Sequence, residues 1–318
     1  LYTGLKKCKA AVDYEIPDRI RDGYGINRQL VQAAWEDGID TILTCDNGIS
    51  ALEQIAYAKE LGMTVIVTDH HELRTREENG EIHSLIPDAD VVVNPHQPDC
   101  PYPYKELCGG AVAYKLVQEL YRMAGFPDQE IEKLMEYAAI ATVGDVMKLT
   151  GENRILVKEG LKRLNQTQNT GLKALIRANG LDGKEINSYH IGFVLGPCIN
   201  ASGRLTTAKK ALELLLCRDT QRADVLAEEL LILNSERKEL TRKGYEEAVE
   251  QIESTSLKED KVLIVYLPDC HESIAGIIAG RIRERYYRPV FVLTDGEKSV
   301  KGSGRSIEGY SMFEEMQK

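Results

Sequence analysis

Short β-branched runs alternate with helix-like segments in the N-terminal part of the chain. Residues 10–16 alternate in polarity like a strand, and residues 41–44, 64–68 and 90–93 are short apolar runs. Helical periodicity lies between them at 27–35 and 50–62, and Ser50 with Glu53 has the spacing of a helix-capping box. Strands that alternate with helices of this length predict an α/β fold with a doubly wound, mainly parallel sheet.

From Gly109 onward the pattern is helical. It predicts helices over 109–123, 129–143 and 153–164, followed by one long, mostly charged helix over 220–252. Such a helix would be about 50 Å long at ~1.5 Å per residue, and long polar helices usually bridge two domains. Beyond it, a predicted helix over 273–286 lies between predicted strands at 261–267 and 289–294. We therefore expect a first domain over 1–205, connecting helices over 206–254 and a second, smaller α/β domain over 255–318.

Composition limits the classes of protein that fit. A chain of 318 residues is long enough for two domains, and it has no apolar run of the eighteen residues that a membrane span needs. Its seven cysteines are scattered without a CxxC motif, which indicates reduced thiols and a cytoplasmic setting. The net charge of −10 argues against non-specific polyanion binding, yet a local basic track can coexist with an acidic exterior.

Two of the apolar runs are followed by residue types that commonly bind metal ions. Asp46 follows the first run, and Asp69, His70 and His71 follow the second. Open α/β sheets place their ligands at the carboxyl ends of the strands. Asp145 follows an apolar helix, where an unpaired carboxylate is costly. Carboxylates and imidazoles without cysteine suit Mn²⁺ or Mg²⁺ and are typical of two-metal phosphoester hydrolysis. Taken alone, Asp46 and Asp145 could each instead cap a loop or a helix.

Three other segments combine small residues with arginine. Backbone N–H groups and a guanidinium can approach a phosphate together where small residues surround the arginine. Each segment alone could also be an ordinary surface turn or loop. They are 200–204 with Arg204, 301–306 with Ser303 and Arg305, and 19–25 with Arg19 and with Tyr24, whose ring could stack on a DNA base.

Together these motifs resemble a known family. Asp69-His70-His71 is the motif that names the DHH phosphoesterases, and the chain as a whole is similar to the RecJ-type exonucleases, which degrade single-stranded DNA in the 5′→3′ direction. The resemblance covers nearly the whole chain. It rests on the DHH motif and on the segments 16–19, 44–50, 99–107, 151–154, 199–205, 271–276 and 302–306.

The resemblance implies roles for individual residues. It implies direct Mn²⁺ or Mg²⁺ ligands, two residues that act at the scissile phosphate, and three that hold the 5′-terminal phosphate of the substrate. It also implies single-stranded DNA as the partner, with a helicase and a single-strand-binding protein as helpers in DNA repair and recombination. The implied ligands are Asp46, His70 and Asp145, the residues at the scissile phosphate are His71 and Arg204, and those at the 5′-phosphate are Arg19, Ser303 and Arg305.

The resemblance also implies motifs that residues 1–318 do not contain. An Asp-x-Asp metal motif is expected before Leu1 and a Gly-Gly-His motif after Lys318, so the chain resembles an internal fragment that would hold metal poorly and could be inactive alone. Two alternatives stay open. One is a DHH phosphodiesterase of short oligonucleotides or cyclic dinucleotides, and the other is a non-catalytic replication scaffold.

Overall fold

The computed structural model describes residues 1–17, 25–78, 80–296 and 299–316. The chain divides into two compact units. Unit 1 comprises Leu1–Ile199 and Leu212–Ala227, and unit 2 comprises Asn200–Ala211 and Glu228–Lys318. The two compact units do not test the predicted division into residues 1–205, 206–254 and 255–318, which stays a prediction. No helix among the described residues combines the length and the apolar character that crossing a membrane requires.

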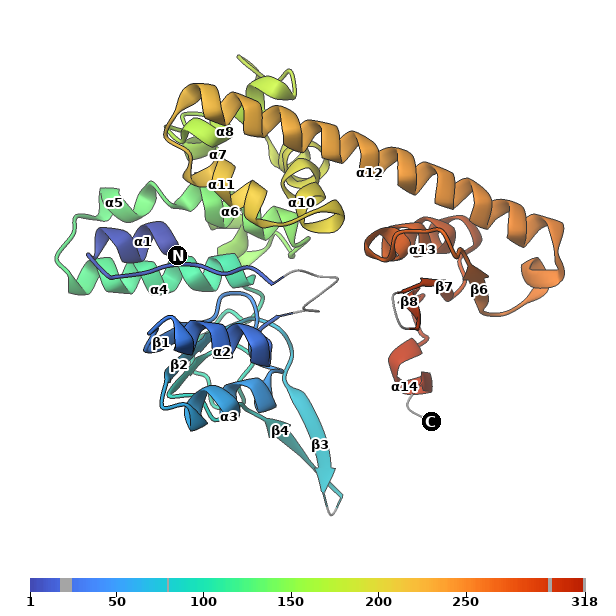
Figure 1. The fold of residues 1–318 in the computed structure, drawn as a ribbon, viewed down its shortest axis with the longest axis horizontal. Coiled ribbons are helices and arrows are strands. Elements are labelled where there is room, and N and C mark those ends of the chain that lie inside the picture. Colours follow the sequence, from blue (N-terminus) through green and yellow to red (C-terminus); the bar gives the residue numbers. More distant parts are fainter. Residues whose placement is uncertain (18–24, 79, 297–298, 317–318) are drawn as a thin grey trace. The chain divides into compact units, whose positions relative to one another are not determined.

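A three-stranded parallel sheet is the centre of the first part of unit 1 (Figure 1). The strand order is β1-β2-β5, with β1 at Thr41–Leu43, β2 at Thr64–Thr68 and β5 at Val91–Val93. Helices α2 (Arg28–Glu36) and α3 (Leu52–Glu60) pack against it through a core that includes Val31, Ile55, Ala58, Met63, Val65 and Val67. Because all three strands are parallel, their carboxyl ends lie at one edge of the sheet.

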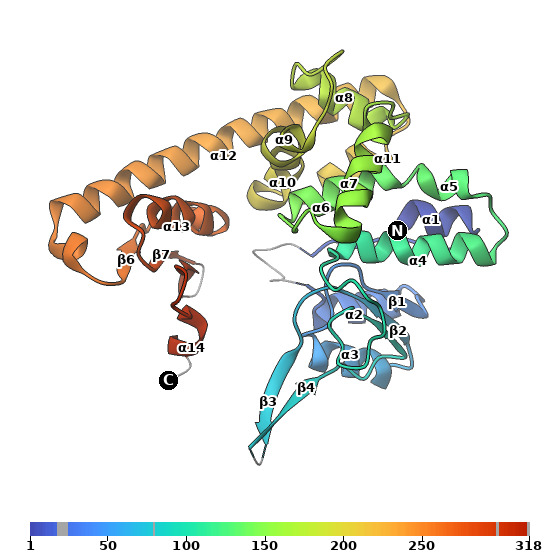
Figure 2. The same ribbon diagram turned by 180° about the vertical axis from the view of Figure 1, so that it is seen from behind.

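A two-stranded antiparallel hairpin follows β2. Its strands are β3 (Arg74–Glu78) and β4 (Glu81–Leu85), and within the described parts of the chain they pair only with each other. Figures 1 and 2 both show this hairpin extending away from the parallel sheet.

The rest of unit 1 is helical. The long amphipathic helix α4 carries much of a second core, which includes Val112, Tyr114, Val117, Tyr121 and Leu156. The helices of this part are α1 (Tyr2–Lys7), α4 (Gly109–Met123), α5 (Asp128–Glu132), α6 (Met135–Gly144), α7 (Gly151–Leu164), α8 (Thr170–Ala178), α9 (Ser188–His190), a π-helical turn (Ile191–Leu195) and α11, at Lys209–Leu216 with its first turn in unit 2.

Unit 2 is a smaller α/β body. Its sheet has the order β6-β7-β8, with β6 parallel and β8 antiparallel to β7. Helix α13 packs on this sheet around Ile274, Ile278 and Ile282. The elements are β6 (Leu263–Tyr266), α13 (Glu272–Tyr286), β7 (Val290–Asp295), β8 (Val300–Arg305) and α14 (Met312–Met316), together with a 3₁₀ turn at Ser256–Glu259. Two more helices belong partly to each unit, α10 (Gly196–Leu205) and the 35-residue α12 (Thr220–Ser254).

The predicted α/β class, the parallel strand-helix alternation and the long helix are confirmed. Three local predictions are wrong. Residues 10–16 form no strand, because none of the described strands pairs with them. The capping box is absent, since Ala51 is the N-cap of α3 and has no side-chain acceptor. The helix predicted over 129–143 is interrupted at residues 133–134 and forms α5 and α6.

Candidate metal centre

Asp46 lies directly beyond β1 in a tight backbone turn. Its N–H donates to the Thr68 carbonyl of β2 at 3.0 Å, which extends the β1–β2 ladder to this residue. Thr44 strengthens the same turn, because its hydroxyl donates to the Asn47 carbonyl at 2.6 Å. Asp46 has a φ of +63°, a left-handed conformation that is uncommon outside glycine and that the surrounding bonds must hold. The strand end therefore presents this carboxylate in one defined direction.

Gly109, the first residue of α4, lies against the Asp46 side chain. A Cβ atom placed on Gly109 would be 2.3 Å from Asp46 Oδ1 and 2.5 Å from Asp46 Cβ. Carbon and oxygen atoms cannot approach that closely, since non-bonded carbon atoms pack at about 3.5–4.0 Å. Only glycine at position 109 lets the start of α4 pack against this carboxylate.

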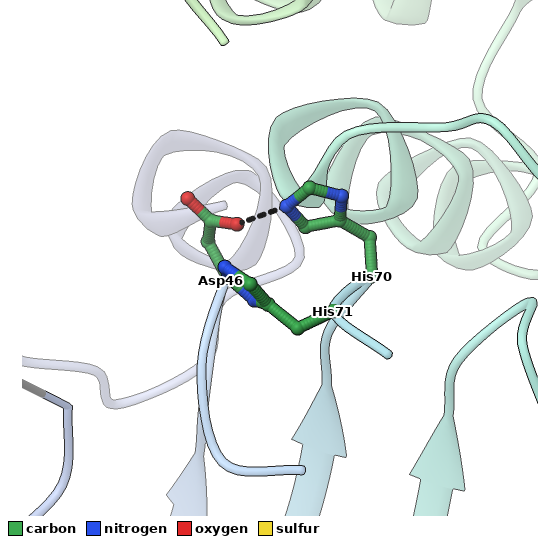
Figure 3. Close-up of side chains that lie close together, drawn as sticks. All are labelled: Asp46, His70 and His71. Atoms are coloured by element: carbon green, nitrogen blue, oxygen red, sulfur yellow. Dashed lines mark ion pairs between the residues drawn. The ribbon is translucent and has the colours of Figure 1, made fainter. Parts of the chain in front are cut away.

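His70 lies between two carboxylates. Its Nε2 atom is 3.0 Å from Asp46 Oδ1 and 3.4 Å from Asp145 Oδ2. Figure 3 shows the His70 ring directed at Asp46 from the end of the neighbouring strand. The hydrogen bond with Asp46 raises the pKa of His70, although burial partly opposes this shift. Positive charge is therefore stabilised on His70 at the point where the potential metal ligands Asp46, His70 and Asp145 converge.

Asp145 lies at the carboxyl end of α6 as its C-cap, the alternative that the sequence left open, and its N–H donates to the Ala141 carbonyl at 2.9 Å. Its side chain is 46% exposed, and partial burial raises its pKa while the neighbouring His70 lowers it. The predicted ligands Asp46, His70 and Asp145 are therefore brought together from two strand ends and one helix end. His71 joins them, because one ligand atom each from Asp46, His70 and His71 lie within 4.8 Å of one another.

Asp69 positions His71 rather than joining the cluster. It is 1% exposed, and its carboxylate accepts from the backbone N–H groups of Ile49, His70 and His71 and from the His71 ring at Nδ1, 2.7 Å away. Burial would raise the pKa of Asp69, but these donors outweigh it and the pKa is lowered. An ionised carboxylate can only accept, so Nδ1 of His71 carries the proton and Nε2 is left for a ligand. Carboxylate–histidine pairs of this kind orient the imidazoles of metal sites.

The donor set fits Mn²⁺ or Mg²⁺. Two carboxylates and an imidazole converge with a second imidazole beside them, and no thiolate belongs to the cluster found among the described residues. Oxygen-rich sites with imidazole suit these ions, whereas structural zinc sites usually contain cysteine. The half-exposed carboxylates leave room for water or substrate oxygens to complete the coordination.

The remaining predicted residues either lie outside the described residues or belong to unit 2. Arg19 and Tyr24 lie outside the described residues. Arg204, Ser303 and Arg305 belong to unit 2. Arg204 lies on α10, not in a loop, and its Nη1 donates to the Ser273 carbonyl at 2.8 Å. The backbone N–H groups around it belong to a helix, so the predicted backbone phosphate cradle is wrong there.

The glycine-rich segment 301–306 is mostly a strand rather than a loop. It forms β8, and Gly302, Ser303 and Gly304 pair with Leu293, Val292 and Phe291 of β7. Both predicted phosphate-binding side chains face the start of α13. A Cβ on Gly276 would be 2.8 Å from Arg305 Nη2 and 3.3 Å from Ser303 Oγ. Glycine at position 276 thus makes room for both.

Sequence reasoning missed the parts played by Asp69 and Gly109. The buried strand before Asp69 could have suggested an inward-facing carboxylate. Gly109 carries no local signal, because its contact with Asp46 joins residues 63 positions apart and exists only in the fold.

Known proteins resemble this chain in sequence and in fold. The family model described as "DHH family, N-terminal domain" matches residues 1–144, which include Asp46, His70 and His71. A solved structure described as exonuclease RecJ bound to manganese is 34% identical and superposes with a TM-score of 0.83, covering 99% of this chain and 75% of that one. The chain belongs to the RecJ family of DHH proteins. The RecJ of Thermus thermophilus in complex with Mn²⁺ is 33% identical, with a TM-score of 0.81 over 99% of this chain and 43% of that one.

Curated relatives extend the match beyond the DHH region. The single-stranded-DNA-specific exonuclease RecJ of Bacillus subtilis is 40% identical over 314 residues, which cover 98% of this chain and 38% of the relative. The protein of the same name from Escherichia coli is 36% identical over 96% of this chain and 54% of its own length. The chain therefore spans between about two fifths and just over half of the length of these RecJ relatives.

Proposed function

We propose that the protein carrying this chain is a metal-dependent exonuclease that degrades single-stranded DNA from the 5′ end. The observation that supports this most is the placement of His70 Nε2 within 3.4 Å of carboxylates from two different elements, beside a second histidine oriented by a buried aspartate. Membership of the RecJ family supports the substrate, since the relatives are named as single-stranded-DNA-specific exonucleases and two RecJ structures contain Mn²⁺.

We assign the metal-ligand roles to Asp46, His70 and Asp145. Two divalent ions, when bound, clamp the attacking water and the leaving oxygen of a phosphodiester. Asp46 would hold such an ion from a fixed strand end, and its partly exposed carboxylate is accessible to it. His71 presents Nε2 to the scissile phosphate, and Asp69 holds the ring in that orientation and stabilises positive charge on it.

Arg204, Ser303 and Arg305 are our candidates for substrate binding. Arg204 acts at the scissile phosphate in this proposal, while Ser303 and Arg305 hold the 5′-terminal phosphate together with Arg19. The support within unit 2 is that a hydroxyl and a guanidinium are adjacent beside Gly276, which suits a charge-assisted, multidentate phosphate contact. A pocket for a terminal phosphate would direct degradation from the 5′ end.

The cellular setting is part of the same proposal. Single-stranded DNA is the partner, and a helicase and a single-strand-binding protein would generate and hold the strand during repair and recombination. We place this activity in the cytoplasm, where all seven cysteines would remain reduced. All seven are free thiols in the structure, which agrees with this setting.

A nuclease assay on the protein carrying this chain tests the proposal. We expect Mn²⁺-dependent release of mononucleotides from the 5′ end of single-stranded DNA, little attack on duplex DNA, and complete loss in Asp46→Ala. Asp182→Ala, an exposed aspartate in a surface turn of the same unit, is the matched control. Hydrolysis confined to dinucleotides or cyclic dinucleotides would favour a phosphodiesterase, and binding without hydrolysis would favour a scaffold. Either result contradicts the proposal.

A further inference from the structure

The β3–β4 hairpin is a projection that the described fold does not need for packing. Its strands pair only with each other, and every described residue of both strands is exposed except the half-buried Leu85. A lone two-stranded hairpin is marginally stable in water, and a third strand or a packed helix normally supports it. An element that contributes so little to the core calls for a role at the surface.

One face of the hairpin is basic next to the sheet and acidic at the tip. Cross-strand partners share a face, so the register Arg74↔Leu85, Arg76↔His83 and Glu78↔Glu81 defines one side. Arg74, Arg76 and His83, which we call the basic face, occupy the half nearer the parallel sheet. The opposite side carries Thr75, Glu77, Ile82 and Ser84. The two arginines are about 6.7 Å apart along the strand, so each can reach a different group of an extended ligand.

The two arginines of the basic face have no carboxylate partner among the described residues. Three other arginines of unit 1 do, since Arg122, Arg163 and Arg177 pair with Glu119, Glu132 and Asp224. In a chain with a net charge of −10, these two adjacent guanidinium groups form a small basic area, on a hairpin that also carries Glu77 on its opposite side and Glu78 and Glu81 at its tip.

The base of the hairpin is fixed to the metal centre. Arg74 follows His71 by three residues, so their Cα atoms are at most about 11 Å apart. The His71 carbonyl accepts from Asn94 Nδ2 at 2.9 Å, and the intervening Glu72 lies 3.4 Å from His96 Nδ1. These bonds attach the start of the hairpin to the loop after β5. The basic face thus begins beside a residue of the metal cluster and leads away from it.

We propose that the basic face binds the phosphate backbone of a single strand on its way to or from the metal centre. This inference rests on the proposed function, because it assumes that a nucleic-acid strand reaches this edge of the sheet. The acidic tip at Glu78 and Glu81 restricts the contact to the half nearer the sheet, so the site holds about two phosphates. The contacts are to the backbone, so they lengthen the bound strand without selecting its sequence.

Salt dependence of DNA binding tests this proposal. Binding of an oligodeoxythymidine long enough to extend past the metal centre is measured without added metal, which prevents hydrolysis. Each phosphate contact to a single strand contributes about −0.7 to the slope of log affinity against log salt concentration. In Arg74→Gln/Arg76→Gln we expect that slope to become shallower by about 1.4, with affinity about tenfold lower at low salt. Arg74→Lys/Arg76→Lys should restore the slope because it retains both charges.

The control removes the same net charge elsewhere. Arg122→Gln/Lys162→Gln replaces two exposed cations on helices α4 and α7, each paired with a glutamate three residues away, and should leave the slope unchanged. An unchanged slope in the hairpin variant, with normal binding by the wild type, overturns the hairpin proposal while the proposed function stands. No DNA binding by the wild type would instead contradict the proposed function. A change in oligomeric state with an unaltered slope would make the hairpin a protein interface, which also overturns the proposal.

Discussion

Gly109→Ala should disable the candidate metal centre, although it replaces none of the proposed metal ligands. The added Cβ would lie 2.3 Å from Asp46 Oδ1 and 2.5 Å from both Asp46 Cβ and Cγ. Ordinary packing distances of about 3.5–4.0 Å require a displacement of at least ~1 Å. The carboxylate oxygen could rotate away, but Asp46 Cβ is fixed by a strained backbone that also donates to Thr68. Either Asp46 or the start of α4 must move.

The size of the effect follows from that displacement. A misplacement of ~1 Å at a catalytic centre costs about a hundredfold in rate. We therefore expect Gly109→Ala to reduce Mn²⁺-dependent hydrolysis by about a hundredfold and to weaken Mn²⁺ binding measured by titration calorimetry. Circular dichroism and thermal melting would show whether the fold is retained.

Gly144→Ala is the matched control for this experiment. Gly144 directly precedes Asp145 in α6, and nothing lies within 4 Å of the position that its Cβ would occupy. Alanine there should leave activity near that of the wild type and slightly favour the helix. Normal activity in a folded Gly109→Ala protein would refute the close-packing argument, as would an equal loss in both variants.

Three further predictions concern separate parts of the molecule. Asp69→Asn should lower activity by about ten- to a hundredfold, since an amide cannot fix the His71 tautomer as a carboxylate does. Unchanged kinetics in the folded variant would show that Asp69 does not contribute to activity. Arg305→Ala should weaken cleavage of 5′-phosphorylated strands about ten- to a hundredfold more than of 5′-hydroxyl strands, because a charge-assisted phosphate contact is worth about 1.5–3 kcal/mol. Equal losses on both substrates would exclude a terminal-phosphate role. Burial raises the pKa of Glu136 to about 7 from 4.5, so the folded state binds this proton more tightly than the unfolded state, and stability should fall as pH rises from about 4.5 to 7. Glu136→Gln should remove up to about 3 kcal/mol of that fall, which denaturant unfolding at several pH values would show.

The positions of Asp46, His70 and Asp145 at the ends of two strands and a helix were predictable from local sequence patterns. Asp46 and His70 each follow a β-branched run, and parallel strands bring such residues to one edge whatever the details of the packing. Asp145 was predictable as a helix end, since Gly144 and an apolar segment precede it. Their convergence at 3.0 and 3.4 Å was implied only by the family resemblance, because spacing along the chain does not place α6 against the sheet.

What could not be predicted depends on partners distant in sequence. The alternation at residues 10–16 has the local pattern of a strand, but a strand needs a neighbour and none of the described strands pairs with it. The opposite error concerns β8, where Gly302 and Gly304 disfavour a strand and β7 supplies the pairing that overrides this preference. The capping box failed for a local reason, because α3 begins at Leu52 and its N-cap is therefore Ala51 rather than Ser50.

Anomalous diffraction at the manganese edge would show directly whether Asp46, His70 and Asp145 bind the metal ion. Crystals of the protein carrying this chain would be grown in saturating Mn²⁺ and compared with crystals of Asp46→Ala. We predict a strong anomalous peak within bonding distance, about 2.0–2.3 Å, of Asp46, His70 and Asp145, and its loss in the variant. Manganese peaks only at other positions, with His70 still hydrogen-bonded to Asp46, would contradict this prediction.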